Sequence, residues 1–215
     1  MTIGDVPRGS PLPGHRLARY RDVDAEAIAA VPAPVRDDNP GVVFVTGLPG
    51  AGKTTLARAL ARSFSRGAHV EEDWVWWWLT MSGAAGHGDE DAFKRERGQV
   101  FLRHVGSLVD NFAAEGFVPV VDGAIMRRSW LGDRLAQMQT RPALLVVLAP
   151  SEETSRSRDS SRSGVTFYDE YPDFANSLAK EFHGMGLWVD SDGLSLEETV
   201  TVILGNLEVA VLDDG

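Results

Sequence analysis

The sequence predicts an α/β fold in which a parallel sheet of about five strands is covered by helices on both faces. Short apolar segments rich in β-branched residues, at 41–47, 117–123 and 143–150, have the composition of strands buried on both sides. Segments with apolar residues at helical spacing alternate with these strands along the chain. Such alternation is typical of parallel sheets, because crossover helices join their strands.

The elements of the first half follow this pattern. After the strand at 41–47, Leu56, Leu60 and Phe64 share one face of a helix. Residues 67–73 form a short second strand that ends in three carboxylates, and a further helix begins with Asp73 near its N-cap. A long helix spans 89–115. In the next strand, 117–123, Pro119 favours a position near an edge or a bulge.

The second half contains a helix at 130–139, the very apolar strand at 143–150 and a polar Ser/Arg-rich segment at 151–164. A helix at 173–184, a short strand at 186–192 and a final helix follow, the last with Ser195 and Glu198 spaced as a capping box. Residues 1–39 contain five prolines and predict a partly irregular N-terminal extension. Residues 40–215 are expected to form the single folded domain.

Composition limits the function classes. The 215 residues carry a net charge of −10, which disfavours nucleic-acid binding. The absence of cysteine excludes disulfides and thiolate metal sites. No apolar run is long enough for a membrane span, and the N-terminus lacks the apolar segment of a signal peptide. These features predict a soluble cytoplasmic protein that binds neither nucleic acid nor membrane.

The most specific motif is GLPGAGKTT at 47–55, which matches the phosphate-binding loop G-x-x-x-x-G-K-[ST] between a strand and a helix. Its glycines let backbone N–H groups converge on phosphate oxygens, and the helix N-terminus adds positive charge. The motif predicts ATP or GTP as cofactor, with Lys53 on the β- and γ-phosphates and the Thr54 hydroxyl on Mg²⁺. The predicted nucleotide-binding residues are Gly47, Pro49, Gly50, Ala51, Gly52, Lys53, Thr54, Thr55 and Arg158.

The order of motifs over roughly 41–208 resembles small-molecule kinases of the nucleotide-kinase-like group, in particular the chloramphenicol phosphotransferase-like and zeta-toxin-like proteins. The resemblance implies a P-loop fold of the nucleoside and shikimate kinase type with a lid, here around 151–165. It implies that Asp73 faces the acceptor hydroxyl and acts as base. It also implies that Asp122 lies near Mg²⁺ and acceptor, and that lid arginines contact the phosphates. Asp73, Lys53, Arg158 and Arg162 are therefore the predicted catalytic residues.

Each role has a structural alternative. Asp73 could simply cap the helix that follows it, and Asp122 could be a structural cap or turn residue. The lid arginines, including Arg156, could be a solvated helix face. At a spacing of four, Arg158 and Arg162 share a side, which favours them over Arg156. Glu71 and Glu72 are expected to be solvated or to have secondary roles.

The segment EEDWVWWW at 71–78 places four tryptophans beside Asp73. Trp74, Trp77 and Trp78 share one helical face, whereas Trp76 points elsewhere. We expect part of this cluster to be core and part to line an acceptor cleft, or to form a homodimer contact. The predicted acceptor-binding residues are Asp73, Trp74, Trp77, Trp78, Asp122, Arg127 and Arg128, and the predicted metal ligands are Thr54 and Asp122.

These observations predict an ATP-dependent phosphotransferase that phosphorylates a hydroxyl group of a small molecule, such as an antibiotic or a nucleoside-like natural product. One alternative is a kinase of a metabolite or nucleotide sugar. A second alternative, of another class, is a non-catalytic nucleotide-binding protein that acts in resistance or as a switch.

Overall fold

The computed structural model describes residues 36, 38–79, 90–163 and 174–213, and only the backbone of 90–94, 161–163 and 174. Within these ranges five strands form one parallel sheet in the order β2-β3-β1-β4-β5. The strands are β1 (Val42–Gly47), β2 (Gly67–Glu71), β3 (Val118–Asp122), β4 (Ala143–Leu148) and β5 (Leu187–Val189). The predicted sheet is therefore confirmed. The extension predicted for 1–39 lies almost wholly outside the described residues.

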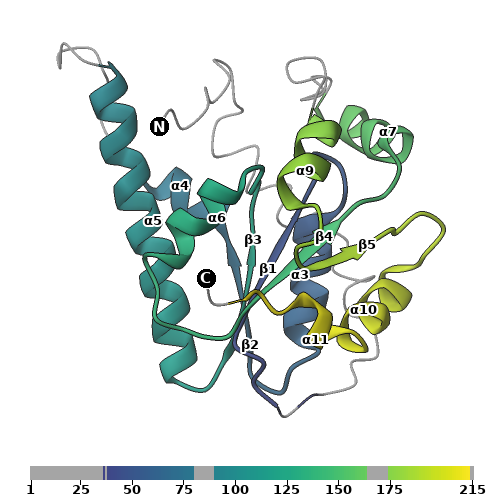
Figure 1. The fold of residues 1–215 in the computed structure, drawn as a ribbon, viewed down its shortest axis with the longest axis horizontal. Helices are drawn as coiled ribbons and strands as arrows, with labels where there is room; N and C mark the ends of the chain where they lie inside the picture. The colour runs from purple at the N-terminus through teal and green to yellow at the C-terminus, as the bar shows by residue number, and fades with distance from the viewer. Residues whose placement is uncertain (1–35, 37, 80–89, 164–173, 214–215) are drawn as a thin grey trace.

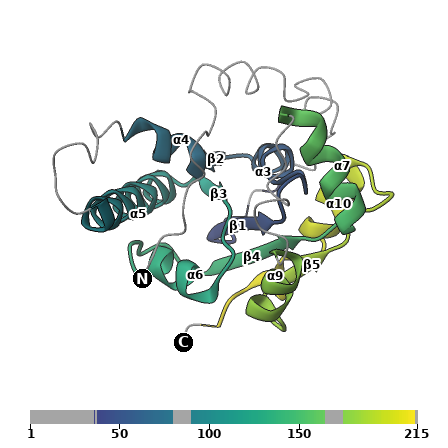
Figure 2. The same cartoon turned by 90° about the horizontal axis from the view of Figure 1, so that it is seen from above.

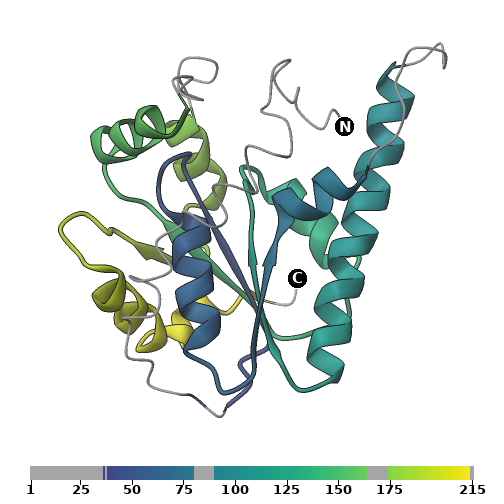
Figure 3. The ribbon, with the colours of Figure 1, turned by 180° about the vertical axis from the view of Figure 1, so that it is seen from behind.

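Helices cover both faces of the sheet (Figure 1). Viewed from above, α3 and α10 lie on one face, and α5, α6 and α9 lie on the other (Figure 2). In the view from the opposite side, Figure 3, α3 lies in front of the sheet. The helices are α3 (Lys53–Arg62), α4 (Glu72–Trp78), α5 (Glu90–Ala114), α6 (Arg128–Leu135), α7 (Glu152–Ser163), α9 (Phe174–Phe182), α10 (Leu196–Leu204) and α11 (Leu207–Ala210).

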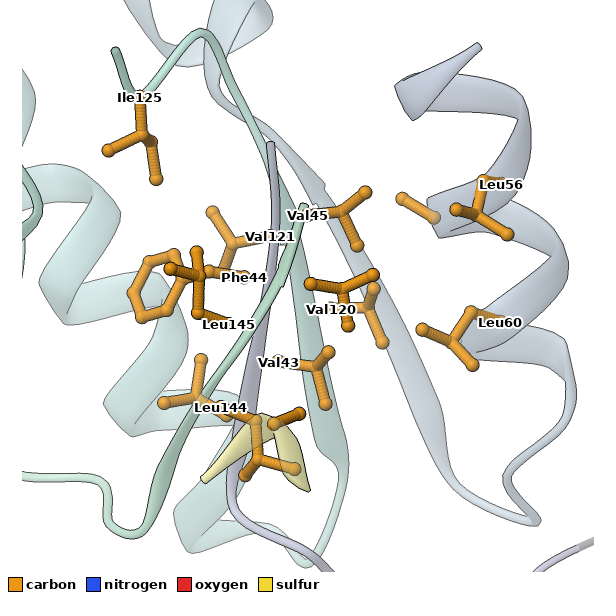
Figure 4. Close-up of a cluster of buried hydrophobic side chains, with 14 of the residues drawn as sticks. Val43, Phe44, Val45, Leu56, Leu60, Val120, Val121, Ile125, Leu144 and Leu145 are labelled. Atoms are coloured by element: carbon orange, nitrogen blue, oxygen red, sulfur yellow. The ribbon is translucent and has the colours of Figure 1, made fainter. Parts of the chain in front are cut away.

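The core follows from strand alternation, which sends successive side chains to opposite faces. All six residues of β1 and all six of β4 are buried, as both faces of the central sheet are covered. In Figure 4, Val43 and Val45 of β1 point toward Leu56 and Leu60 of α3, whereas Phe44 points to the other face. This alternation decides the placement of the polar residues at the strand ends.

Several local expectations are confirmed. The 25 residues of α5 match the long helix predicted at 89–115. Ser195 caps α10 through the predicted capping box, in which its side chain accepts from the Glu198 backbone and the Glu198 side chain accepts from the Ser195 backbone. The short helix α11 was not predicted.

Taken as a whole, β3 lies inside the sheet between β2 and β1, but its early part has a paired neighbour on one side only, as expected for Pro119. Pro119 is aligned with Ala68 of β2, but the alignment of β3 with β1 starts one residue later, at Val120. At Pro119 the strand pairs with β2 only, so a residue without an N–H is tolerated there.

The parallel arrangement brings the carboxyl ends of β1, β2, β3 and β4 to one edge of the sheet, which is where ligands of open α/β sheets bind. The phosphate-loop motif, the acidic segment 71–73 and Asp122 all lie at this edge. Among the helices in the described ranges, none combines the length and apolar character needed to cross a membrane.

Candidate active site

The loop between β1 and α3 has the backbone of a phosphate-binding loop. Gly52 is the N-cap of α3 in the left-handed conformation, with φ of 97°, which favours glycine. No side chain caps the helix, so its first-turn N–H groups are not taken up by the N-cap residue. Lys53 Nζ donates to the Leu48 carbonyl over 2.9 Å, across the loop. The arrangement offers backbone donors, a helix N-terminus and a cation to an anionic ligand.

The loop packs directly against α7, the helix of the predicted lid. Gly50 has φ of 76°, and a Cβ atom there would lie 2.1 Å from the Ser155 carbonyl oxygen. Ser155 is fully buried and Asp159 nearly so. One side of α7 therefore packs directly on the phosphate loop.

Asp122, at the end of β3, lies between two polar side chains. The Thr54 hydroxyl of α3 donates to Asp122 Oδ2 over 2.6 Å. His69 Nε2 of β2 lies 2.6 Å from Asp122 Oδ1. Asp122 as a whole is only 3% exposed. The two predicted metal ligands, Thr54 and Asp122, are thus in contact although 68 positions separate them in the chain.

A second carboxylate faces the same side of the sheet. Glu71 of β2 is aligned with Asp122 of β3, and its Oε2 lies 3.4 Å from an Arg58 guanidinium nitrogen. Thr54 and Arg58 are one turn apart on α3, so this helix contacts both carboxylates from one face. Burial raises the pKa of Glu71 to about 7, with further contributions from the charges of Asp122 and Asp73.

The raised pKa of Glu71 predicts how stability depends on pH. Between its ordinary pKa of 4.5 and its folded pKa of about 7, the native state binds more protons than the unfolded state, so stability falls as pH rises. Glu71→Gln cannot titrate. Relative to this variant, the wild-type protein should lose on the order of 2 kcal/mol between pH 5 and pH 8, measured by urea unfolding without nucleotide. The exposed Glu115→Gln is the control, and pH curves for wild type and Glu71→Gln that stay parallel would contradict the prediction.

Glu72 lies on the opposite face of the sheet from Glu71. Arg134 of α6 binds both its oxygens, with Nε 2.5 Å from Oε1 and Nη2 2.6 Å from Oε2. Both residues are buried. A Cβ atom at Gly123 would lie 2.0 Å from Glu72 Oε2, so glycine leaves the room for this ion pair. Burial raises the pKa of Glu72, and the charge of Arg134 opposes this rise.

Of the two alternatives for Glu71 and Glu72, solvation was therefore wrong, and a secondary role stays a prediction. The physical reason is strand alternation: successive residues at the end of β2 point to opposite faces, and both faces are covered by helices. One carboxylate meets α3 and the other meets α6.

Breaking the buried ion pair should be costly. Arg134→Met leaves the Glu72 charge buried without its partner, and we expect a loss of about 3–5 kcal/mol in the free energy of unfolding. The double change Glu72→Met and Arg134→Met removes both charges and should recover most of that loss. Chemical denaturation of the two variants measures this difference. A single variant as stable as the wild-type protein would show that the pair contributes nothing.

Asp73 lies in the first turn of α4 and is exposed. The N-cap of α4 is Glu71, two residues before Asp73, so the expected position of Asp73 near the N-cap is confirmed. The helix begins early because β2 already ends at Glu71. A carboxylate in the first turn still interacts favourably with the helix dipole.

The tryptophans divide as their helical spacing predicted. Trp76 packs on the core, with its ring 5.5 Å from that of Phe101 and the Arg97 guanidinium carbon 4.0 Å from its centroid. Trp78 is 62% exposed, and Trp74 and Trp77 are half-buried. The face predicted to line an acceptor cleft is thus the face that the core does not fill.

The predicted arginines have different surroundings. Arg128 is held by α9, because its side chain donates to the main-chain carbonyls of Glu181 and His183. These contacts account for Arg128 without an acceptor. Arg127 is exposed, with its guanidinium carbon 5.6 Å from the ring centroid of Trp130.

In α7, Arg156 pairs with Glu152 along the helix over 2.8 Å, and Arg158 is exposed. The backbone of Arg162 belongs to the same helix, but its side chain lies outside the described residues. The structure thus places Arg156 in a surface ion pair, in keeping with the preference for Arg158 and Arg162 as lid residues.

Three residues of this region were missed by sequence reasoning: His69, Arg58 and Arg134. Their partners lie on other elements, so no local spacing marks them. The sequence offers one weaker signal: His69 and Glu71 are two residues apart in a strand, so their side chains share one face, which is also the face of Asp122.

The comparisons with known proteins agree with this geometry. A family model described as an AAA domain matches residues 42–175. A tunicamycin resistance protein from Deinococcus radiodurans has a similar structure, with a TM-score of 0.57 and 17% identity over 81% of this chain and 98% of that one.

Two further solved structures share the fold. A sugar kinase from a Janibacter species has a TM-score of 0.55 and 20% identity, over 79% of this chain and 95% of its own. A gluconokinase from Sinorhizobium meliloti has a TM-score of 0.53 and 19% identity, over 80% and 96%. No curated protein matches the chain. Since the family model spans more than half of the sequence and includes the phosphate loop, the chain belongs to this AAA domain family.

Proposed function

We propose that this protein is an ATP- or GTP-dependent phosphotransferase that transfers the γ-phosphate to a hydroxyl group of a small molecule. The observation that carries the proposal is the 2.6 Å contact between Thr54 Oγ1 and Asp122 Oδ2 beside the phosphate loop. A nucleotide-binding loop alone explains binding. A buried carboxylate that is hydrogen-bonded to the Thr54 hydroxyl would in addition help to bind the metal ion that phosphoryl transfer requires.

The residues at this edge fit Mg²⁺ and a nucleotide. A hydroxyl and a carboxylate are oxygen ligands, and Mg²⁺ keeps several waters and takes phosphate oxygens besides one or two protein groups. In the described part of the chain no three His, Cys, Asp or Glu side chains gather into a metal site of their own, which suits an ion brought in with a nucleotide. Thr54 and Asp122 would hold the ion, and the loop N–H groups would hold the phosphates.

The chemistry then depends on positioning and charge. The transition state is loose and its negative charge spreads over the phosphoryl oxygens, so Mg²⁺ would offset part of that charge when bound. Lys53 would stabilise the β- and γ-phosphate oxygens. Asp73 would orient the acceptor hydroxyl and accept its proton late in the transfer. Arg158 and Arg162, on the helix that packs against the loop, would add positive charge from the lid.

The acceptor would lie against α4. Asp73 and Trp78 are exposed there, and Trp74 and Trp77 are half-buried, so the surface beside the base is aromatic. Indole surfaces suit a ring-containing, partly apolar acceptor. We therefore propose an antibiotic or a nucleoside-like natural product, in line with the resemblance to the chloramphenicol phosphotransferase-like group. Arg127, which is exposed, would contact an anionic substituent of the acceptor. The proposal assumes a soluble cytoplasmic enzyme.

Acceptor-dependent product formation tests the proposal. The protein is incubated with MgATP and a panel of acceptors that includes gluconate, shikimate, tunicamycin and chloramphenicol. ADP release is measured together with the mass of the acceptor. Transfer adds about 80 Da and must depend on both substrates. Lys53→Ala is the inactive control. Nucleotide binding without a product across a broad hydroxyl panel would favour the non-catalytic alternative.

A further inference from the structure

His69 lies on the same face of the sheet as the proposed metal site. It is aligned with Val120, two residues before Asp122, and Glu71 is aligned with Asp122 itself. Side chains two residues apart in a strand share a face, so His69 and Asp122 are diagonal neighbours across β2 and β3. None of the chemistry proposed above uses this histidine.

The contact that His69 makes is short and buried. Its Nε2 lies 2.6 Å from Asp122 Oδ1, and the two side chains are 11% and 4% exposed. A carboxylate oxygen accepts hydrogen bonds, so the imidazole donates from Nε2. On the other side, Oδ2 accepts from Thr54. Each oxygen of Asp122 therefore has one donor, from a different element.

These two donors are not equivalent. Thr54 is itself a proposed metal ligand, so its hydroxyl serves the ion and Asp122 together. His69 belongs to β2, and in the described part of the chain its contact is the one that fixes Oδ1 from outside the phosphate loop. Groups that hydrogen-bond to a metal-binding carboxylate fix its orientation and contribute to metal affinity.

We infer that His69 is a positioning residue that orients Asp122 for the metal ion of the bound nucleotide. The inference rests on the proposed Mg²⁺–nucleotide site. It assigns to His69 no proton transfer and no contact with nucleotide or acceptor. Its consequence is specific: loss of the Nε2–H donor should weaken the Mg²⁺-dependent part of nucleotide binding and leave the metal-independent part unchanged.

The test compares His69→Leu, which removes the donor, with His69→Gln, whose side-chain amide can reach a similar position. ADP affinity is measured by titration calorimetry over a range of Mg²⁺ concentrations and in EDTA. For His69→Leu, the Mg²⁺ concentration that gives half of the affinity gain should rise about 10–100-fold. For His69→Gln, this Mg²⁺ concentration should return most of the way to the wild-type value. His104→Leu, on the exposed side of α5, should match the wild-type protein.

Two results would overturn the inference: an unchanged Mg²⁺ dependence in His69→Leu, or an equal loss of ADP affinity with Mg²⁺ and in EDTA. The second would mean that His69 supports the phosphate loop as a whole. Should His69→Leu fail to fold, His69→Asn replaces it, since its amide is too short to reach Asp122 and the same loss is expected. Failure of the wild-type protein to bind ADP under any condition would instead overturn the proposed function.

Discussion

Lys53→Ala is expected to reduce phosphoryl transfer by at least about 10²–10³-fold while the fold remains intact. Lys53 Nζ donates a hydrogen bond to the Leu48 carbonyl across the phosphate loop, and the residue is half-buried. In the proposed reaction its charge stabilises the developing negative charge of the transition state, and removal of one preorganised donor typically has an effect of this size. Steady-state turnover and thermal unfolding are to be measured on the same preparation.

Lys180→Ala is the matched control, because Lys180 is exposed on α9 and is not part of the phosphate-loop motif. It loses the same functional group and should keep full activity. A folded Lys53→Ala protein with the turnover of Lys180→Ala would remove the basis of the kinase proposal.

The features that sequence predicts well here are those fixed by local interactions. The phosphate loop, the buried strands and the long amphipathic helix α5 each carry a pattern within one segment, and the structure confirms all three. The capping box of α10 also depends only on Ser195 and Glu198. Local patterns suffice because the periodicity of a segment determines which face is buried.

What sequence could not predict depends on distant partners. Glu72 is like any charged surface residue until Arg134, 62 positions later, is placed beside it. His69 acquires its interest only when β3 is aligned with β2. The interior position of β3 likewise reflects the strand order, which crossover connections do not encode locally. The proposed metal ligands Thr54 and Asp122 could therefore be predicted from the sequence. The residues that contact the carboxylates at the strand ends, namely His69, Arg58 and Arg134, could be found only from the fold.

The structure also presents two candidates for the base where the sequence favoured one. Asp73 is exposed in the first turn of α4, the helix that carries Trp74, Trp77 and Trp78. Glu71 lies deeper, beside Arg58 and aligned with Asp122. A pKa of about 7 suits Glu71 to proton transfer at neutral pH, but its burial against α3 removes it from the face with the tryptophans. Access to the acceptor therefore favours Asp73.

Asp73→Asn is expected to lower turnover by about two to four orders of magnitude, because the amide keeps the shape of the side chain but cannot accept a proton. Stability should fall by only about 0.3–1 kcal/mol, the usual contribution of a first-turn charge to the helix dipole. ATP affinity should stay unchanged, since the phosphate loop is built from other elements. Turnover, ATP affinity and unfolding are measured in parallel, with the exposed Asp213→Asn as control.

Glu71→Gln distinguishes the two carboxylates. If Asp73 is the base, Glu71→Gln keeps most of its turnover and changes mainly the pH dependence of stability. If Glu71 is the base, the variant loses turnover instead and Asp73→Asn stays active. In that case kcat/KM of the wild-type enzyme rises with pH through about 7, the pKa of Glu71 in the folded enzyme without substrates. Full activity in both variants would mean that neither accepts the proton. Positioning and charge at Lys53, Thr54 and Asp122 would then have to account for the transfer, as a loose transition state allows.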